Sequence, residues 1–412
     1  MNVLVLGNGF DLWHKLPTTY LCFLASTEYL VKQMQLKNRT IGEVFSAIQD
    51  QCSTVKNSYM AYKSVYDQCI IPVESISELI DKCEKNCWWK LFKNYYNQEL
   101  GWIDFEKEIF KTIVFINAFI DRHSDPTRDI DLNKKNNEIA TFFMELFEKS
   151  SYISSTYGSR KYSYYFRFKS EYCIKQEGSR KETVNKEKVA EKLVSTLEEF
   201  SMILGLYFIL FVEKPLERLL ETDLLKTNNT FKGFDKIITF NYTNSFEKIY
   251  KNETVAHIHG SLRNRIVLGI NSNQDDEADG DLTYIGFKKY YQRVVYGTDL
   301  SYLGVLQEMR NQFQQNHKVS LSIVGHSLDE TDKDSLQELF EVSNEIRIYY
   351  YKDDQIADFT RKLIHHFGKT KFDELRYNRR LQFLPLESIS LPTSETIEWN
   401  LPFQVHKNIY ED

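Results

Sequence analysis

The chain has 412 residues, of which 42% are hydrophobic and 14% aromatic, and its formal net charge at pH 7 is −6. This apolar content excludes an intrinsically disordered protein, and the length predicts two lobes or one domain with a large insertion. The negative charge excludes a protein that attracts nucleic acid through a global basic field.

Short apolar segments at both ends of the chain predict the strands of an α/β domain. In chain order they are residues 2–7, 235–242, 254–260, 265–270, 319–325 and 345–351, each bounded by turn residues. Several lack polar alternation, as strands buried on both faces do. A helical pattern at 329–344 links the last two, and a further helix is predicted at 353–367. This order predicts a parallel sheet with right-handed crossovers.

The middle of the chain is mostly helical in pattern. Residues 27–150 and 186–226 carry helical periodicity and are interpreted as amphipathic packing helices. The predicted fold class is α/β, a Rossmann-like parallel sheet split by a long, mostly α-helical insertion. We expect three parts: an α/β nucleotide-binding domain of residues 1–26 and 231–385, a helical insertion domain of residues 27–230, and a C-terminal tail of residues 386–412.

Two irregular segments interrupt this pattern. Residues 151–182 interleave tyrosines with basic side chains, among them Arg160, Lys161 and Arg167. Such a mixture is typical of proteins that bind single-stranded nucleic acid, and also of exposed β-hairpins. Residues 271–281 are acidic and turn-rich, without the spacing of an EF-hand.

Targeting and redox features favour a soluble, cytoplasmic protein. The first apolar run is interrupted by Gly7, Asn8 and Asp11, so it does not resemble a secretory signal. The most apolar helical stretch, at 202–212, is too short to cross a bilayer, and no membrane partner is expected. The six cysteines contain no CxxC pair, so we expect reduced structural thiols.

The first motif is VLVLGNGFDL at residues 3–12. A strand that runs into Gly7-Asn8-Gly9 lets backbone approach a ligand closely, and the helix that follows points N–H groups at phosphate. The third glycine of the dinucleotide-binding fingerprint is absent, since Leu12 stands in its place. Asp11 has two interpretations, a cap of the next helix or a partner of a ribose hydroxyl.

Two later motifs follow predicted strands. In TFNYTNSFEKIY, the amide of Asn241 can donate and accept in a polar cleft, or the residue simply ends the strand in a turn. In AHIHGSL, His257 and His259 face the same side, but no third ligand lies nearby to complete a metal site. We interpret His259, followed by Gly260, as a general base.

The fourth motif is IVGHSLDETDKD at residues 323–334. Here Gly325 follows a predicted strand, and the backbone amides of residues 326–328 can line the same crevice as the first motif. Ligands of open parallel sheets bind at the carboxyl ends of the strands. Because all four motifs lie at such ends, they predict one nucleotide-sized site.

Taken together, these motifs resemble those of the bacteriophage abortive infection AbiH family. The resemblance lies, in order, in LVLGNGFDL…LPTTYLCFL (4–24), W-x-D-x-E (Trp102, Asp104, Glu106), FNYT, HIHG and GHSL-x-E-x-D. Membership implies a prokaryotic role in phage defence, in which an infected cell halts its own growth. A phage-derived trigger is then an expected partner, and a homo-oligomer is left open.

A more distant similarity is to sirtuins and sirtuin-like NAD hydrolases. They carry a Gly-x-Gly turn, an Asn-x-Asp, a His-Gly and a late Gly-x-Ser in the same order. The matching positions here are Gly7 and Gly9, Asn241, His259 and Gly260, and Gly325 and Ser327, with Glu247 after the asparagine. Thr243 stands where that aspartate is expected, and Phe10 and Asp11 replace small residues.

The similarity implies an enzyme that cleaves NAD into nicotinamide and ADP-ribose, with NAD as substrate and no metal. His259 would take a proton from a ribose hydroxyl or water, Asn241 would position the water, and Asp11 would supply negative charge to an oxocarbenium-like state. The expected nucleotide-binding residues, gathered from all four motifs, are Gly7, Asn8, Gly9, Phe10, Thr243, Gly260, Gly325, His326, Ser327, Leu328 and Asp332. Two alternatives stay open, a metal-dependent nuclease acting on RNA or DNA and a non-catalytic nucleotide-binding sensor.

Overall fold

The computed structural model describes most of the chain. The described residues are 1–97, 104–123, 139–156, 159–175, 182–222, 224–225, 231–252, 254–271 and 282–389, and for 150–156 and 159–165 the backbone alone is described. Trp102, most of the acidic segment 271–281 and the tail from residue 390 onward lie outside these residues. So do the side chains of Arg160 and Lys161.

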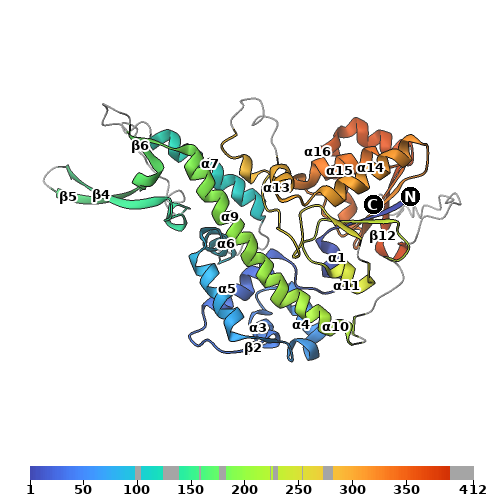
Figure 1. Ribbon diagram of the computed structural model, residues 1–412, viewed down its shortest axis with the longest axis horizontal. Coiled ribbons are helices and arrows are strands. Elements are labelled where there is room, and N and C mark those ends of the chain that lie inside the picture. Colours follow the sequence, from blue (N-terminus) through green and yellow to red (C-terminus); the bar gives the residue numbers. More distant parts are fainter. Residues whose placement is uncertain are drawn as a thin grey trace, which may run out of the picture.

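A six-stranded parallel sheet forms the centre of the α/β region (Figure 1). Its strands, in spatial order, are β12 (Leu381–Pro385), β11 (Glu345–Tyr350), β10 (Ser320–Val324), β1 (Asn2–Leu6), β8 (Lys236–Thr239) and β9 (Val255–His257). When these six strands are numbered along the chain and read from β9 to β12, their order is 3-2-1-4-5-6, which is that of the Rossmann fold. The predicted fold class is confirmed. The chain order reverses between β1 and β10, which marks the place where such folds bind their ligands.

The two central strands explain why the sequence reads as apolar runs without polar alternation. All residues of β10 are buried, as are Val3 to Leu6 of β1. Leu4 and Leu6 pack into a hydrophobic cluster shared with the insertion, whereas Val3 and Val5 pack into a second cluster on the other face. That second face is covered by helices that follow the later strands: α14 (Leu300–Gln314), α15 (Lys333–Glu341) and α16 (Asp354–Tyr377).

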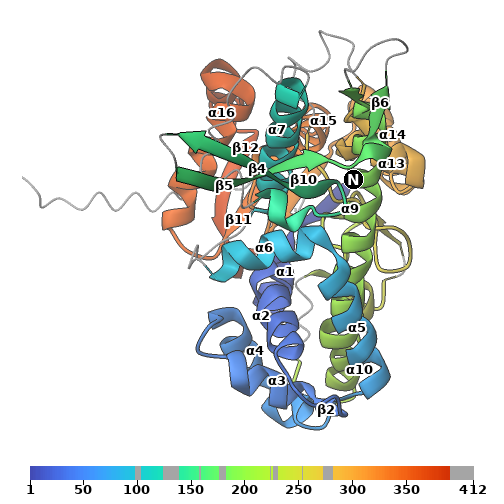
Figure 2. The ribbon, with the colours of Figure 1, turned by 90° about the vertical axis from the view of Figure 1, so that its left-hand side faces the viewer.

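The insertion between β1 and β8 is built mainly from helices (Figure 2). They are α2 (Tyr20–Val31), α3 (Ile41–Ile48), α4 (Ser53–Tyr66), α5 (Val73–Lys85), α6 (Cys87–Asn97), α7 (Phe105–His123), α9 (Lys186–Phe208) and α10 (Lys214–Leu220). A π-helical turn, Ile209–Glu213, joins α9 to α10. The insertion and the sheet share one hydrophobic cluster, so the insertion helices pack directly against the sheet.

The helical stretch Lys186–Leu220 is, among the described residues, long and apolar enough by composition to cross a membrane, but 61% of its most apolar window is buried inside the protein. The apolar stretch 202–212, expected to be too short to cross a bilayer, is thus part of a longer helical stretch, most of whose apolar window packs inside the protein.

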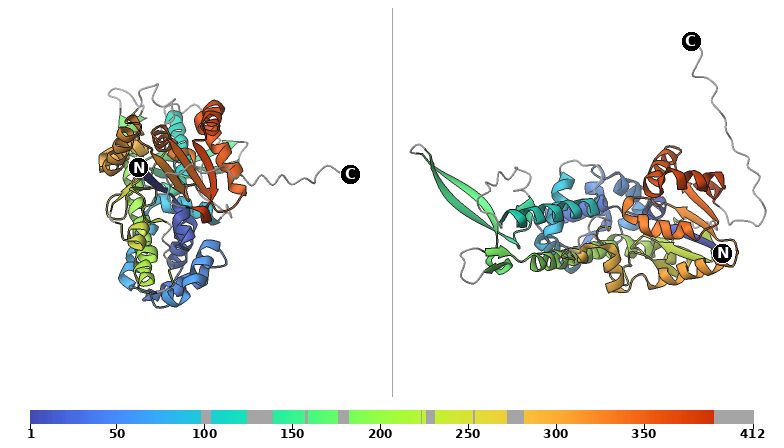
Figure 3. Two further views of the ribbon diagram at one scale, coloured as in Figure 1. Left: turned by 90° about the vertical axis from the view of Figure 1, so that its right-hand side faces the viewer. Right: turned by 90° about the horizontal axis from the view of Figure 1, so that it is seen from above.

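Short elements complete the fold. They are α1 (Asn8–Trp13), α11 (Ser245–Tyr250) and α13 (Lys289–Tyr296), the small pairs β2 (Arg39–Thr40) with β3 (Ile70–Ile71) and β6 (Cys173–Lys175) with β7 (Glu182–Val184), and the long hairpin β4 (Phe147–Thr156) with β5 (Ser159–Phe168). Single 3-10 turns cover Ser170–Tyr172, Ile285–Phe287, Glu330–Asp332 and Leu386–Ser388. Figure 3 shows the β4–β5 hairpin projecting from one end of the molecule. Residues 151–182 therefore lie largely within the antiparallel pairs β4–β5 and β6–β7, as the β-hairpin interpretation expects, and nucleic-acid binding by this segment stays a prediction.

One predicted strand is wrong. Residues 265–270 form no strand, and Ile270 makes a single bridge to Lys288. Both backbone polar groups of Leu268 instead bind the side-chain amide of Gln292. The amide donates to the carbonyl of Leu268 and accepts from its N–H, each at 3.0 Å. A side chain thus takes the place of a neighbouring strand.

Three further differences concern two helix ends and one missed strand. The helix predicted at 329–344 begins with the 3-10 turn Glu330–Asp332 before α15. The helix predicted at 353–367 continues through a kink at Gly368 to Tyr377. The sequence patterns also missed β12, a short edge strand that ends at a proline.

Candidate functional site

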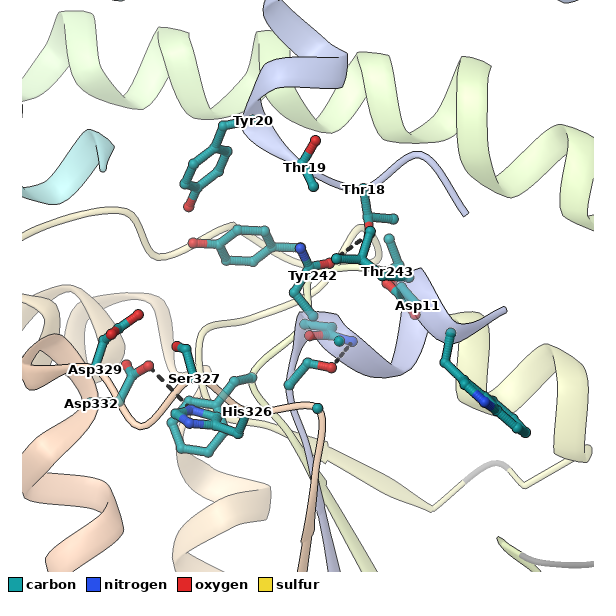
Figure 4. Close-up of a pocket in the computed structure, with 18 of the residues that line it drawn as sticks. Asp11, Thr18, Thr19, Tyr20, Tyr242, Thr243, His326, Ser327, Asp329 and Asp332 are labelled. Atoms are coloured by element: carbon teal, nitrogen blue, oxygen red, sulfur yellow. Dashed lines mark hydrogen bonds and ion pairs between the residues drawn. The ribbon is translucent and has the colours of Figure 1, made fainter. Parts of the chain in front are cut away.

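A cleft of about 800 Å³ opens at the carboxyl ends of β1, β8 and β10 (Figure 4). Figure 4 shows Asp11 and Thr243 on one side of it and His326, Asp329 and Asp332 on the other. The insertion contributes residues to its lining, among them Thr18, Thr19, Tyr20, Asp104, Glu106 and Phe208. The position is the reversal point of the sheet, and the volume is within the usual range for small-molecule sites.

The glycine turns after β1 and β10 are pressed against each other. The N–H of Gly9 donates to the carbonyl of Gly325 at 2.7 Å. A Cβ on Gly7 would lie 2.5 Å from Cα of His326, and one on Gly9 would lie 2.6 Å from Cα of Gly325. The contact between the two turns is therefore sufficient reason for glycine at both positions. Asn8, between them, lines the cleft.

Asp11 lies inside α1 and is completely buried. Its carboxylate accepts a hydrogen bond from Oγ1 of Thr243 at 2.6 Å and another from Oγ of Ser245. Burial raises the pKa of Asp11 to about 6, although both hydroxyl donors favour the ionised form. The helix-cap interpretation of Asp11 is wrong, since Gly7 is the N-cap of α1 and Thr19 caps α2.

The turn after β8 is held from two sides. On the sheet side, the amide of Asn241 donates to the carbonyl of Gly7 at 3.2 Å. On the insertion side, the carboxylate of Glu213 accepts the backbone N–H of Asn244 at 2.7 Å and pairs with Lys248. Glu213 is the last residue of the π-helical turn, a type of irregularity that is frequent at functional sites.

His257 supports this turn and does not line the cleft. Its Nδ1 lies 3.0 Å from the carbonyl oxygen of Asn241, and its Nε2 lies 2.7 Å from Oε1 of Glu247. Both ring nitrogens are therefore engaged with oxygen acceptors. Among the described residues, no three His, Cys, Asp or Glu side chains form a group that could hold a metal ion, so the metal hypothesis for His257 and His259 gains no support here.

Asp332 is the centre of a buried polar network. One carboxylate oxygen accepts from Nε2 of His259 at 2.8 Å and from Nζ of Lys289 at 3.2 Å. The other lies 3.3 Å from Nε2 of His326, whose Nδ1 accepts the N–H of Leu328 and so fixes the tautomer. Although burial opposes ionisation, Lys289 and His259 hold the pKa of Asp332 well below its usual range.

His259 is neutral at physiological pH. Burial lowers its pKa to about 4, and the cation of Lys289 adds to the effect. Because Nε2–H donates to Asp332, the lone pair lies at Nδ1, and that buried atom has no hydrogen-bond partner among the described residues. A neutral imidazole with a free lone pair can act as a base or accept a ligand hydroxyl.

Glu106 brings the insertion into the same network. It lies in the first turn of α7, and its Oε1 is 2.7 Å from Nζ of Lys289 on α13. Its Oε2 is buried and has no hydrogen-bond partner in the described part of the chain. Burial raises the pKa of Glu106 to about 7 even though Lys289 favours the ionised form.

Most of the residues expected from the sequence meet in the cleft. Those that line it are Gly7, Asn8, Gly9, Asp11, Asn241, Thr243, His259, Gly325, His326, Ser327 and Asp332. Phe10, Gly260 and Leu328 do not. Phe10 packs against Phe231 and Phe246, and Leu328 is buried in the second hydrophobic cluster. Gly260 has φ +72°, and a Cβ there would lie 1.9 Å from the carbonyl oxygen of Arg265.

Sequence reasoning missed Lys289 and did not assign Glu106 to the site. Glu106 belongs to the W-x-D-x-E motif, which the sequence reveals, but the sequence does not show that this motif reaches the cleft. Lys289 belongs to the GFKKYY segment, which carries no motif. The two residues are far apart in the sequence, and only the fold places them together.

A protein-family model described as bacteriophage abortive infection AbiH matches residues 3–351. The match runs from β1 through the insertion to the end of β11, so it includes the glycine turns and the Asp332 network. No curated protein and no solved structure matches the chain.

Proposed function

Because the chain belongs to the bacteriophage abortive infection AbiH family, we propose that its antiphage role is carried out by cleavage of NAD⁺ into nicotinamide and ADP-ribose in this cleft. The family assignment supports the abortive-infection role itself. The observation that carries the proposed chemistry is His259, a neutral and buried imidazole with an unpartnered Nδ1, on a residue that lines the cleft.

The charge of the cleft favours a cationic substrate group. The described residues that line it include six carboxyl groups and three lysines, namely Asp11, Asp104, Glu106, Asp329, Asp332, Asp358, Lys15, Lys289 and Lys362. The oxidised nicotinamide ring is cationic, and positive charge develops on the ribose as the bond to it breaks. Fixed carboxylates near that ribose would stabilise the transition state more than the ground state in water.

The proposed reaction needs only a weak base. The bond between C1′ and the nicotinamide nitrogen breaks, and its electron pair neutralises the ring, which leaves without a proton. A water oxygen bonds to C1′, and the released proton passes to Nδ1 of His259. A base whose pKa is about 4 is adequate here because the water attacks a carbon that already carries positive charge.

Nicotinamide release from NAD⁺ tests the proposal. We expect the purified protein, or cells that express it during phage infection, to release nicotinamide, and His259→Ala to reduce the rate by about 10²–10⁴-fold. His365→Ala is the matched control, since this histidine is exposed on α16 and does not line the cleft. No release by the unaltered protein under either condition, or equal release by His259→Ala, would sink the proposal.

The low basicity of His259 also fits a second candidate function, a sensor that binds a nucleotide without turnover. Binding of NAD⁺ measured by calorimetry, without nicotinamide release and with toxicity unchanged in His259→Ala, would favour it. A metal-dependent nuclease has no support from the described residues, whose side chains form no metal-binding group.

A further inference from the structure

Two buried acceptors on residues that line the cleft have no donor in the described part of the chain. They are Nδ1 of His259 and Oε2 of Glu106. Both residues line the cleft, and the side chain of His259 is only 6% exposed. An unsatisfied buried acceptor is unfavourable, so two in one network indicate a ligand that supplies donors.

Three consecutive contacts connect the two acceptors. Nε2 of His259 lies 2.8 Å from Oδ1 of Asp332, this oxygen lies 3.2 Å from Nζ of Lys289, and Nζ lies 2.7 Å from Oε1 of Glu106. The first and the last of these contacts use the atoms of His259 and Glu106 that are not orphaned. Asp332 and Lys289 therefore hold both side chains in place and leave one acceptor of each free.

Lys289 also determines which donor suits Glu106. Its ammonium group lies 2.7 Å from Oε1 and favours the ionised form of Glu106, and a second cation at Oε2 would be repelled by this ammonium group. A neutral donor, a hydroxyl or an amide N–H, meets no such penalty. Because His259 and Glu106 belong to one network and both line the cleft, one ligand can supply both donors.

A vicinal diol has this chemistry, and the ribose that carries nicotinamide has one. Resting on the proposed function, we propose that Glu106 accepts a hydrogen bond from one hydroxyl of this ribose while His259 accepts from the other. The helical insertion then supplies a specificity-determining residue to the site, and it selects substrates that have an intact ribose diol.

The primary amide of nicotinamide also offers two neutral donors and is the main competing ligand group. NAD⁺ analogues separate the two. One analogue lacks the 2′- or 3′-hydroxyl of the nicotinamide ribose, and the other carries 3-acetylpyridine, which has no amide N–H. We expect the unaltered protein to lose about tenfold or more in affinity or kcat/KM for the deoxy analogue, and little for the acetylpyridine analogue.

The decisive variant is Glu106→Gln, compared with Glu108→Gln two residues along the same helix. Glu108 does not line the cleft and pairs with Lys111. We expect Glu106→Gln to bind NAD⁺ about tenfold more weakly and to lose most of its discrimination between NAD⁺ and the deoxy analogue, while Glu108→Gln keeps both. Equal melting temperatures of Glu106→Gln and the unaltered protein would show that the fold is retained, and Glu106→Asp serves as the second variant if they differ.

The outcomes separate the inference from the function on which it rests. If the unaltered protein uses NAD⁺ but Glu106→Gln discriminates between the analogues as before, Glu106 only anchors the insertion and the inference is overturned alone. If the acetylpyridine analogue shows the loss instead, the amide occupies this place and the inference is again wrong. If the unaltered protein neither binds nor cleaves NAD⁺, the proposed function and the inference fall together.

Discussion

Replacement of Gly9 by alanine tests the contact between the two glycine turns. The new Cβ would lie 2.6 Å from Cα and 2.8 Å from the carbonyl oxygen of Gly325, whereas ordinary contacts are about 3.5–4 Å. Both close neighbours are backbone atoms, so no side chain can rotate away. The turns must therefore separate by about 1 Å, which also stretches the 2.7 Å hydrogen bond from Gly9 to Gly325.

The cost follows from these terms. Overpacking costs about 1–3 kcal/mol and the weakened hydrogen bond about 1 kcal/mol, while alanine regains up to about 1 kcal/mol of helix propensity in α1. We expect Gly9→Ala to lower the free energy of unfolding by about 1–3 kcal/mol. At about 1 °C per kcal/mol for a chain of this length, the melting temperature falls by roughly 1–4 °C.

Gly304→Ala is the matched control for this substitution. Gly304 lies within α14, and a Cβ there would meet nothing within 4 Å. The same chemical change should raise the melting temperature slightly, since alanine favours the helix by up to about 1 kcal/mol. Scanning calorimetry of both variants checks the pair. Gly9→Ala with a melting temperature at or above that of the unaltered protein would refute the packing explanation of the glycine turns.

Three further predictions concern buried polar groups. Glu213→Ala removes the buried partner of the turn after β8 and should lower the free energy of unfolding by about 3–5 kcal/mol. The side chain of Glu217 is 63% exposed, and Glu217→Ala should lower it by less than about 1 kcal/mol. Urea denaturation compares the two variants, and equal losses would contradict the role given to Glu213. Thr243→Val removes a donor from buried Asp11 and should cost about 1–3 kcal/mol by the same assay, so unchanged stability would show that this bond is dispensable. Burial lowers the pKa of His259 from 6.5 to about 4, so stability is lost as the pH falls from about 6.5 to 4, by about 3 kcal/mol in total. Burial raises the pKa of Asp11 from 3.8 to about 6, so its contribution is present below about pH 4 and is lost as the pH rises through 6. The two trends oppose each other, so Asp11→Asn should lose stability more steeply toward pH 4 than the unaltered protein does. If the difference in urea midpoint between Asp11→Asn and the unaltered protein were the same at every pH from 4 to 7, this expectation would be wrong.

The parallel sheet was predictable from the sequence because its strands are buried on both faces. Such strands appear as short apolar runs, as in residues 319–325, whatever lies around them. Residues 265–270 show the same pattern without forming a strand. What decides there is Gln292, whose side chain occupies the backbone groups that a neighbouring strand would use. Local pattern cannot reveal such a competitor distant in the sequence.

The candidate site divides in a similar way. Residues in turns after strands, such as Asn241 and His259, were predictable because the carboxyl ends of parallel strands meet at one edge. Glu106 and Lys289 lie on separate helices, and their meeting depends on how the insertion packs against the sheet. Phe10 shows the opposite case, since it neighbours the glycine turn in sequence while its ring faces the core.

The central place of β1 has a consequence for how the protein is made. Leu6 pairs with Thr239 on one side and with Val324 on the other, and 318 residues separate Leu6 from Val324. At about 5–20 residues per second, synthesis of this interval takes roughly 15–65 s. The first strand leaves the ribosome early and must wait for both partners, as the high contact order of the sheet requires. The cleft therefore cannot assemble on a nascent chain until β10 has been made, and a chain that stops before residue 320 cannot build it at all.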